Sequence, residues 1–135
     1  MATLEEFCTI SAGLRPRMLG KTPSGVRLDF AFEGTAESPH WEGSRPVSGI
    51  DYATIRSDGN LNLDIRGVIG EGRKTVSYRA MGVSIMKSKT EAMPRELLTF
   101  ETSDEDLSWL NTAIGVAIGE GKGLDLSLTV YIVRD

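Results

Sequence analysis

The chain has 135 residues, 40% of them hydrophobic and 25% charged, and a formal net charge of −4. This length and balance predict one globular domain over residues 1–135, large enough to bury roughly two thirds of its extended surface. The Lys and Arg residues are scattered, so neither nucleic acid nor an anionic membrane surface is expected as a partner. No apolar run approaches the ~20 residues that a membrane-spanning helix needs.

Cysteine and histidine are each represented once, by Cys8 and His40. A single cysteine allows no intrachain disulfide, and the acidic start Met1–Phe7 lacks the basic and apolar segments of a signal peptide, so we expect a cytoplasmic protein. One histidine and one cysteine offer no ligand set for zinc or iron, and no phosphate-binding glycine motif opens a helix. We therefore expect neither a metal nor another cofactor.

Alternation of apolar and polar residues predicts a chain made mostly of strands. In chain order these are Leu4–Ala12, Val26–Glu33, a short one at His40–Ser44, Gly49–Arg56, Leu61–Ile69, Lys74–Met86, Leu107–Ile118 and Leu124–Ile132. The stretch Leu107–Ile118 is apolar enough for a helix, but Gly115, the adjacent Gly119 and the β-branched residues favour a strand. The segment Met93–Leu98 fits equally a short helix opened by Pro94 and extended chain leading to Phe100.

The connections carry turn signals. Residues 13–25, with two prolines and three glycines, predict a loop, and Arg45-Pro46 argues against a central strand at that point because proline has no N–H to donate. Asp58-Gly59, Gly70–Arg73 and Gly119–Gly123 predict hairpin turns. About eight to ten regularly spaced strands without helical crossovers predict an all-β, antiparallel sandwich or barrel. A single closed barrel is favoured because closure removes both exposed edges.

Several sequence blocks together resemble the DUF3237 (UPF0311) family of uncharacterised bacterial proteins. The blocks are Gly20–Arg27, Gly34-Thr35, Gly49–Tyr52, Ser57–Gly59 leading into Leu63–Arg66, and Trp109–Asn111. The resemblance implies a lipocalin-like or allene-oxide-cyclase-like antiparallel barrel with a central cavity and no assigned reaction. The chain departs from the family pattern at Glu33, where a second glycine is frequent, and at Ala36, where an aromatic residue is usual.

The candidate catalytic residues are Asp51, Asp64 and Arg66. Asp64 and Arg66 share one face of a strand because they are two residues apart, and the Asp58-Gly59 hairpin brings Asp51 to the neighbouring strand. Facing a lumen, the acids could accept a proton and the arginine could stabilise an anion. Facing water, the same residues form an ordinary cross-strand ion pair contributing under ~1 kcal/mol.

Five further side chains are candidates for ligand binding. Two tyrosines could donate hydrogen bonds into a cavity, an indole and an amide two residues apart could orient a ligand, and a histidine beside a tryptophan could act as a base; they are Tyr78, Tyr131, Trp109, Asn111 and His40. For each of them the pattern by itself favours a structural role instead, in the core, on the rim or in a surface loop.

Three functions remain open on these residues. The first is a barrel that binds a small organic ligand in its lumen and acts as a cofactor-free isomerase, cyclase or lyase. The second is a carrier of a hydrophobic ligand, with the apolar faces of Val26–Phe32 and Leu124–Ile132 lining the lumen and Asp64 and Arg66 facing water. The third is an interaction module, in which a homodimer covers apolar residues left outside the barrel.

Overall fold

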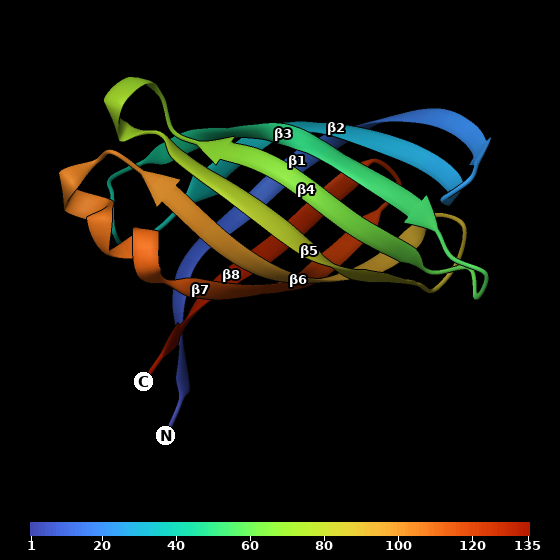
Figure 1. The fold of residues 1–135 in the computed structure, drawn as a ribbon. Helices are drawn as coiled ribbons and strands as arrows, with labels where there is room; N and C mark the ends of the chain where they lie inside the picture. The colour runs from blue at the N-terminus through green and yellow to red at the C-terminus, as the bar shows by residue number, and fades with distance from the viewer.

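The computed structural model describes all 135 residues and forms a closed barrel of eight antiparallel strands (Figure 1). The prediction of a single antiparallel barrel is therefore confirmed. The strands are β1 (Thr3–Thr22), β2 (Gly25–Glu37), β3 (Ser44–Ile55), β4 (Leu61–Ile69), β5 (Val76–Met86), β6 (Glu91–Thr102), β7 (Ile114–Lys122) and β8 (Asp125–Arg134). Two 3₁₀ segments connect strands, η1 (Gly72–Lys74) and η2 (Glu105–Thr112).

Strand β1 closes the ring because it pairs with both of its neighbours in space. Its first half pairs with β8 and its second half with β2, and a bulge between Glu6 and Cys8 lets both Phe7 and Cys8 be buried. The predicted loop over residues 13–25 is wrong, since β1 continues to Thr22 and only two residues form the turn. Pro16 is tolerated because the β8 ladder ends at Gly13, which leaves that edge of β1 without a partner.

Other boundaries also differ from the prediction. Residues 40–43 form a turn, and β3 begins at Ser44 with Pro46 already opposite Thr35 near the strand's end. The open choice at Met93–Leu98 is resolved as extended chain. The predicted strand Leu107–Ile118 is wrong in its first half, where η2 begins after the Asp104 side chain accepts a hydrogen bond from the Asp106 N–H.

The lumen is lined by the apolar face of most strands. Phe30 and Phe32 of β2 and Leu126 and Leu128 of β8 face inward, as the carrier hypothesis expects. Glycine is needed at two inward positions: a Cβ on Gly49 would lie 2.6 Å from the Phe32 ring, and one on Gly67 would lie 2.5 Å from the Tyr78 ring. These glycines make room for two large rings inside the barrel.

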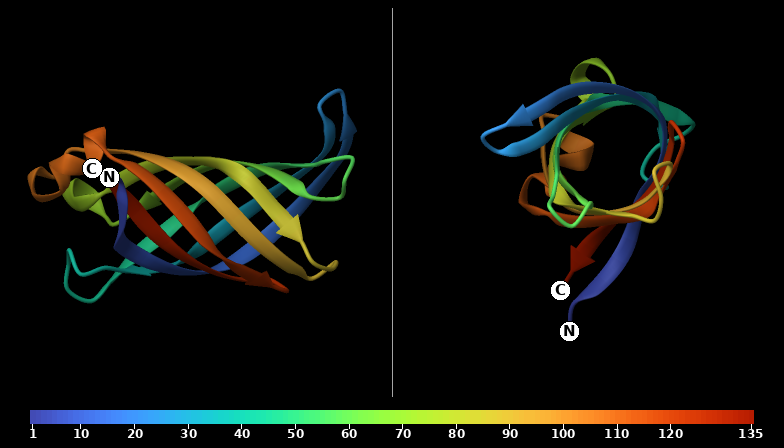
Figure 2. Two further views of the ribbon diagram at one scale, coloured as in Figure 1. Left: turned by 90° about the horizontal axis from the view of Figure 1, so that it is seen from below. Right: turned by 90° about the vertical axis from the view of Figure 1, so that its right-hand side faces the viewer.

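The two ends of the barrel differ. At the end that carries both termini, η2 and residues 38–43 lie over the opening, and an aromatic cluster fills it with ring centroids 5.1–5.9 Å apart: Phe7, His40, Trp41, Phe100 and Trp109. We call this the closed end. The opposite end carries four hairpin turns, and the view along the barrel in Figure 2 shows them arranged around its rim. We call this the open end. No helix is long and apolar enough to span a membrane.

Candidate functional site

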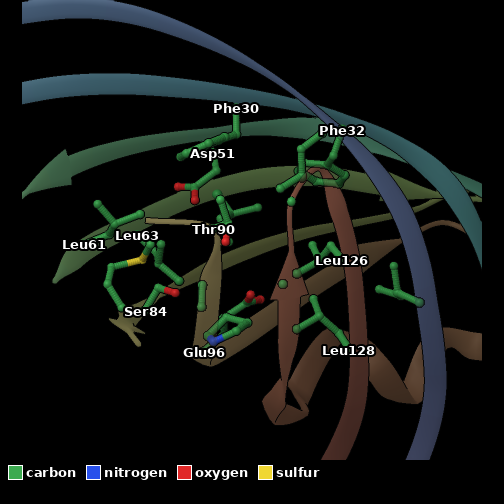
Figure 3. Close-up of a pocket in the computed structure, with 18 of the residues that line it drawn as sticks. Phe30, Phe32, Asp51, Leu61, Leu63, Ser84, Thr90, Glu96, Leu126 and Leu128 are labelled. Atoms are coloured by element: carbon green, nitrogen blue, oxygen red, sulfur yellow. The ribbon is translucent and has the colours of Figure 1, made fainter. Parts of the chain in front are cut away.

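A cavity of about 150 Å³ occupies the lumen on the side of the open end (Figure 3). Most of its lining is apolar, contributed by β1, β2, β4, β5 and β8: Ile10, Leu14, Phe30, Phe32, Leu61, Leu63, Ile65, Met86, Leu126 and Leu128. Hairpin residues Lys89, Thr90 and Gly123 line its mouth. Its polar lining inside the barrel is confined to Asp51, Tyr78, Ser84 and Glu96.

Asp51 points into this cavity from β3. The β3–β4 ladder is interrupted between the pairs Asp51↔Ile65 and Thr54↔Asn62, and within that gap the Asp64 N–H donates to Asp51 Oδ1 at 3.0 Å. This bond fixes the carboxyl group and leaves its second oxygen free. Burial raises the pKa of Asp51 to about 7, outweighing the hydrogen bond, which favours the ionised form.

Glu96 points into the same cavity from β6. Its cross-strand neighbours are Gly82 and Ala117, whose small size leaves space for the carboxyl group. Glu96 forms no ion pair within the chain, and only 6% of the residue is exposed. Burial, and secondarily the charge of Asp51, raise the pKa of Glu96 to about 8. Two carboxyl groups on separate walls thus titrate near neutral pH.

Tyr78 and Ser84 complete the polar lining from β5. Burial, followed by the nearby Glu96 carboxyl, raises the pKa of the Tyr78 phenol above its ordinary value, so the phenol stays protonated and can donate a hydrogen bond. Ser84 is buried directly across from Pro94. Lys89 is the one basic residue among the cavity-lining side chains, and it forms no ion pair within the chain.

The structure separates the three predicted catalytic residues. Asp51 faces the lumen, but Asp64 and Arg66 lie on the outer face of β4, because Leu61, Leu63 and Ile65 occupy its inner face. The expected acid–arginine cluster in the lumen is therefore wrong. The backbone N–H of Asp64, not its side chain, reaches Asp51.

Of the five predicted ligand-binding residues, Tyr78 alone lines the cavity. His40 and Trp109 pack against Phe7 in the closed end, with their ring centroids 5.1 Å apart. Asn111 is exposed. Its Oδ1 accepts a hydrogen bond from the Thr102 N–H, and its Nδ2 donates one to the Thr102 carbonyl oxygen. Tyr131 lies on the outer face of β8, since Leu126, Leu128, Val130 and Ile132 face inward.

Sequence reasoning missed Glu96, although a signal was present. When Met93–Phe100 is treated as a strand, Pro94, Leu98 and Phe100 share one face, and Glu96 is the single acid on it. Leaving helix and strand open for this segment hid that pattern. Asp51 carries the same signal, as an acid on the face of Ala53 and Ile55.

A family model described as "Protein of unknown function (DUF3237)" matches residues 2–133. No curated protein matches the chain. Solved structures with the same fold include a β-barrel-like protein from Acinetobacter baumannii, with a TM-score of 0.84, 20% identity, and coverage of 99% of this chain and 97% of that one. A protein of unknown function from Clostridium acetobutylicum has a TM-score of 0.82, 19% identity and coverage of 99% and 100%. An enzyme from Penicillium herquei has a TM-score of 0.66, 18% identity and coverage of 98% and 95%.

Proposed function

The chain belongs to the DUF3237 family, and from the geometry of its lumen we propose that it binds a small, mostly apolar organic molecule there and rearranges it by acid–base chemistry without a cofactor. The observation that carries this proposal is the pair of buried carboxyl groups, Asp51 and Glu96, in a cavity otherwise lined largely by apolar side chains. The barrel from P. herquei is described as an enzyme, but its likeness extends to the fold alone. The argument for catalysis therefore rests on the two carboxyl groups.

Cavity size limits the ligand. A closed cavity of roughly 150 Å³ accommodates a molecule of the size of benzene. The lumen, at about 150 Å³, therefore suits one ring or a short branched chain, and any longer part of the ligand extends through the open end past Lys89 and Thr90. Phe30 and Phe32 offer ring faces and edges to such a ligand.

The surroundings of the two carboxyl groups suit opposite roles. The Asp64 N–H donates to Asp51 and favours its ionised form, which can accept a proton. No hydrogen bond favours the ionised form of Glu96, and burial together with the charge of Asp51 favours its protonated form, which can donate a proton. Asp51 removes a proton from one atom of the ligand while Glu96 delivers a proton to another. An isomerisation or cyclisation gains and loses no protons overall, but it leaves Asp51 protonated and Glu96 ionised, so one proton passes from Asp51 to Glu96 through water to restore the pair.

Tyr78 and Ser84 act as orienting groups in this proposal. Both carry a hydroxyl on the β5 wall, between the strands that hold Asp51 and Glu96. A hydroxyl can donate a hydrogen bond to a ligand carbonyl and fix which atom faces each carboxyl group.

A non-catalytic carrier is the second candidate, and the apolar lining of the lumen favours it. Carrier and enzyme differ in one respect, because an enzyme needs the two carboxyl groups and a carrier needs only the apolar walls. If the protein is a carrier, Glu96→Gln should still retain the ligand, and neither the variant nor the wild type should alter the ligand chemically.

The test is to incubate the purified protein with a small-molecule extract of its host and to identify retained compounds by native mass spectrometry and chromatography. The enzyme proposal expects a compound that is retained and returned chemically changed by the wild type. Glu96→Gln and Asp51→Asn should retain it unchanged, and the control Glu101→Gln, an exposed acid on the outer face of β6, should behave as wild type. Retention without change by all four proteins would establish the carrier, and no retention by any would contradict ligand binding in the lumen.

A further inference from the structure

The outer wall of the barrel carries an apolar surface that the lumen function does not use. Side chains on the outside of β5, β6, β7 and β8 form one row across the strands through the pairs Met81↔Leu97, Leu97↔Val116 and Val116↔Tyr131. Ile114 and Ile118 flank this row on β7, and Val133 and Leu4 extend it over the paired ends of β8 and β1. We call these eight residues the outer apolar patch.

Large apolar side chains in this patch are well exposed: Leu97 by 64%, Ile114 by 58% and Ile118 by 54%. Single exposed apolar residues are ordinary on any protein, but residues that are neighbours across four adjacent strands form a continuous surface. The lumen does not account for them, because their side chains point away from it.

The area of the patch fits a protein interface. At ~100 Å² for a fully exposed large aliphatic side chain, the eight residues expose on the order of 400 Å² of apolar surface. Apolar atoms make up a little over half of a typical interface. An apolar patch of this size with an ordinary polar rim therefore corresponds to ~700 Å² of buried surface per partner, close to the ~800 Å² of a standard interface.

The rim of the patch carries charges that lack partners within the chain. The row ends in an acid on each side, Asp64 opposite Met81 on β4 and Glu6 opposite Tyr131 on β1, and neither forms an ion pair. A two-fold axis parallel to the strands, between β6 and β7, places β5 of one copy opposite β8 of the other and β6 opposite β7. Met81 then meets Tyr131 and Leu97 meets Val116, so the apolar row is complementary to a second copy of itself.

We propose that the chain forms a symmetric homodimer through the outer apolar patch, with a second copy of itself as the partner. The sequence argument for a dimer named no residues on the outside of the barrel. The apolar faces of Val26–Phe32 and Leu124–Ile132 supply lumen-lining residues, and the outer apolar patch is a different set. The open end and the lumen lie away from this surface, so each copy keeps an accessible cavity.

Sedimentation velocity of the full chain at 5 and 100 µM tests the proposal. We expect a species of twice the 14.7 kDa chain mass for the wild type. Leu97→Glu should sediment as a monomer, since it places a charge at the centre of the patch. Leu19→Glu, at a position exposed by 52% on β1 outside the patch, should remain dimeric. Thermal unfolding by circular dichroism shows whether Leu97→Glu is folded, and Met81→Lys serves as a second interface variant if it is not.

A wild type that is monomeric at both concentrations would overturn the proposal and leave the patch to a different partner. A wild-type dimer that survives in folded Leu97→Glu or Met81→Lys would overturn it as well, because the interface would then lie elsewhere.

Discussion

Replacing Glu96 by Gln should stabilise the protein at alkaline pH and leave its stability at acid pH nearly unchanged. Glu96 is raised from an ordinary pKa of 4.5 to about 8 in the folded protein. The folded protein therefore binds more protons than the unfolded chain between these pH values, and its free energy of unfolding falls as the pH rises through them. At 1.36 kcal/mol per pKa unit, the cost of burying Glu96 amounts to about 4 kcal/mol at pH 8 and almost nothing at pH 4.

Gln has the shape of a protonated Glu and does not ionise, so Glu96→Gln should escape this cost. The assay is urea unfolding at pH 4, 6 and 8, followed by tryptophan fluorescence and extrapolated linearly to water. We expect the variant to exceed the wild type by about 4 kcal/mol at pH 8 and by under ~0.5 kcal/mol at pH 4. Glu101→Gln, the exposed control on the same strand, should track the wild type at every pH. A difference between Glu96→Gln and wild type that is independent of pH would refute the reasoning.

Three other predictions concern packing and reactivity. Gly67→Ala should lower the free energy of unfolding in urea by about 1–3 kcal/mol, because the added Cβ would overlap the Tyr78 ring. Gly13→Ala, whose added Cβ would have nothing within 4 Å, should be neutral or slightly stabilising. Equal effects of the two substitutions would contradict the packing account. Cys8 should resist alkylation by iodoacetamide at pH 8 until denaturant is added, since burial raises the pKa of its thiol to about 12. Rapid labelling of the folded protein would contradict this, because it would show that the thiol is accessible. Asn111→Ala should cost about 1–2 kcal/mol by removing two hydrogen bonds to the backbone of β6, and an unchanged melting temperature would show that water replaces them.

The fold could be predicted because its main signals are local. Alternation in Val26–Glu33 and Leu124–Ile132, together with the Asp58-Gly59 turn, indicates strands joined by hairpins, and closure follows from the need to remove edges. The errors occur where distant pairing overrides a local signal. Residues 13–22 look like a loop, yet β2 supplies a partner for all of them except Leu19, which lies in a bulge between Met18 and Gly20.

The candidate site was harder to predict because alternation shows that two faces differ without showing which one points inward. Asp64 and Arg66 are as regularly spaced as Asp51, but the apolar side of β4 takes the lumen and puts them outside. The informative signal is a carboxyl group on a face that is otherwise apolar. Asp51 and Glu96 share that property, and it places each of them in the cavity. The shape of the lumen around them is set by side chains from several strands, and no spacing in the sequence encodes it.

Carbon-13 NMR of protein labelled at the side-chain carboxyl carbons of Asp and Glu, titrated from pH 3 to 10, tests the central claim most directly. The lumen account predicts two carboxyl resonances that titrate near pH 7 and pH 8, well apart from the exposed acids. Glu96→Gln and Asp51→Asn should each remove one of these two resonances, and the one that remains in Asp51→Asn should titrate at a lower pH because the Asp51 charge no longer raises the pKa of Glu96. If every carboxyl group titrated between about pH 3 and 5, the lumen would hold no acid–base pair suited to neutral pH.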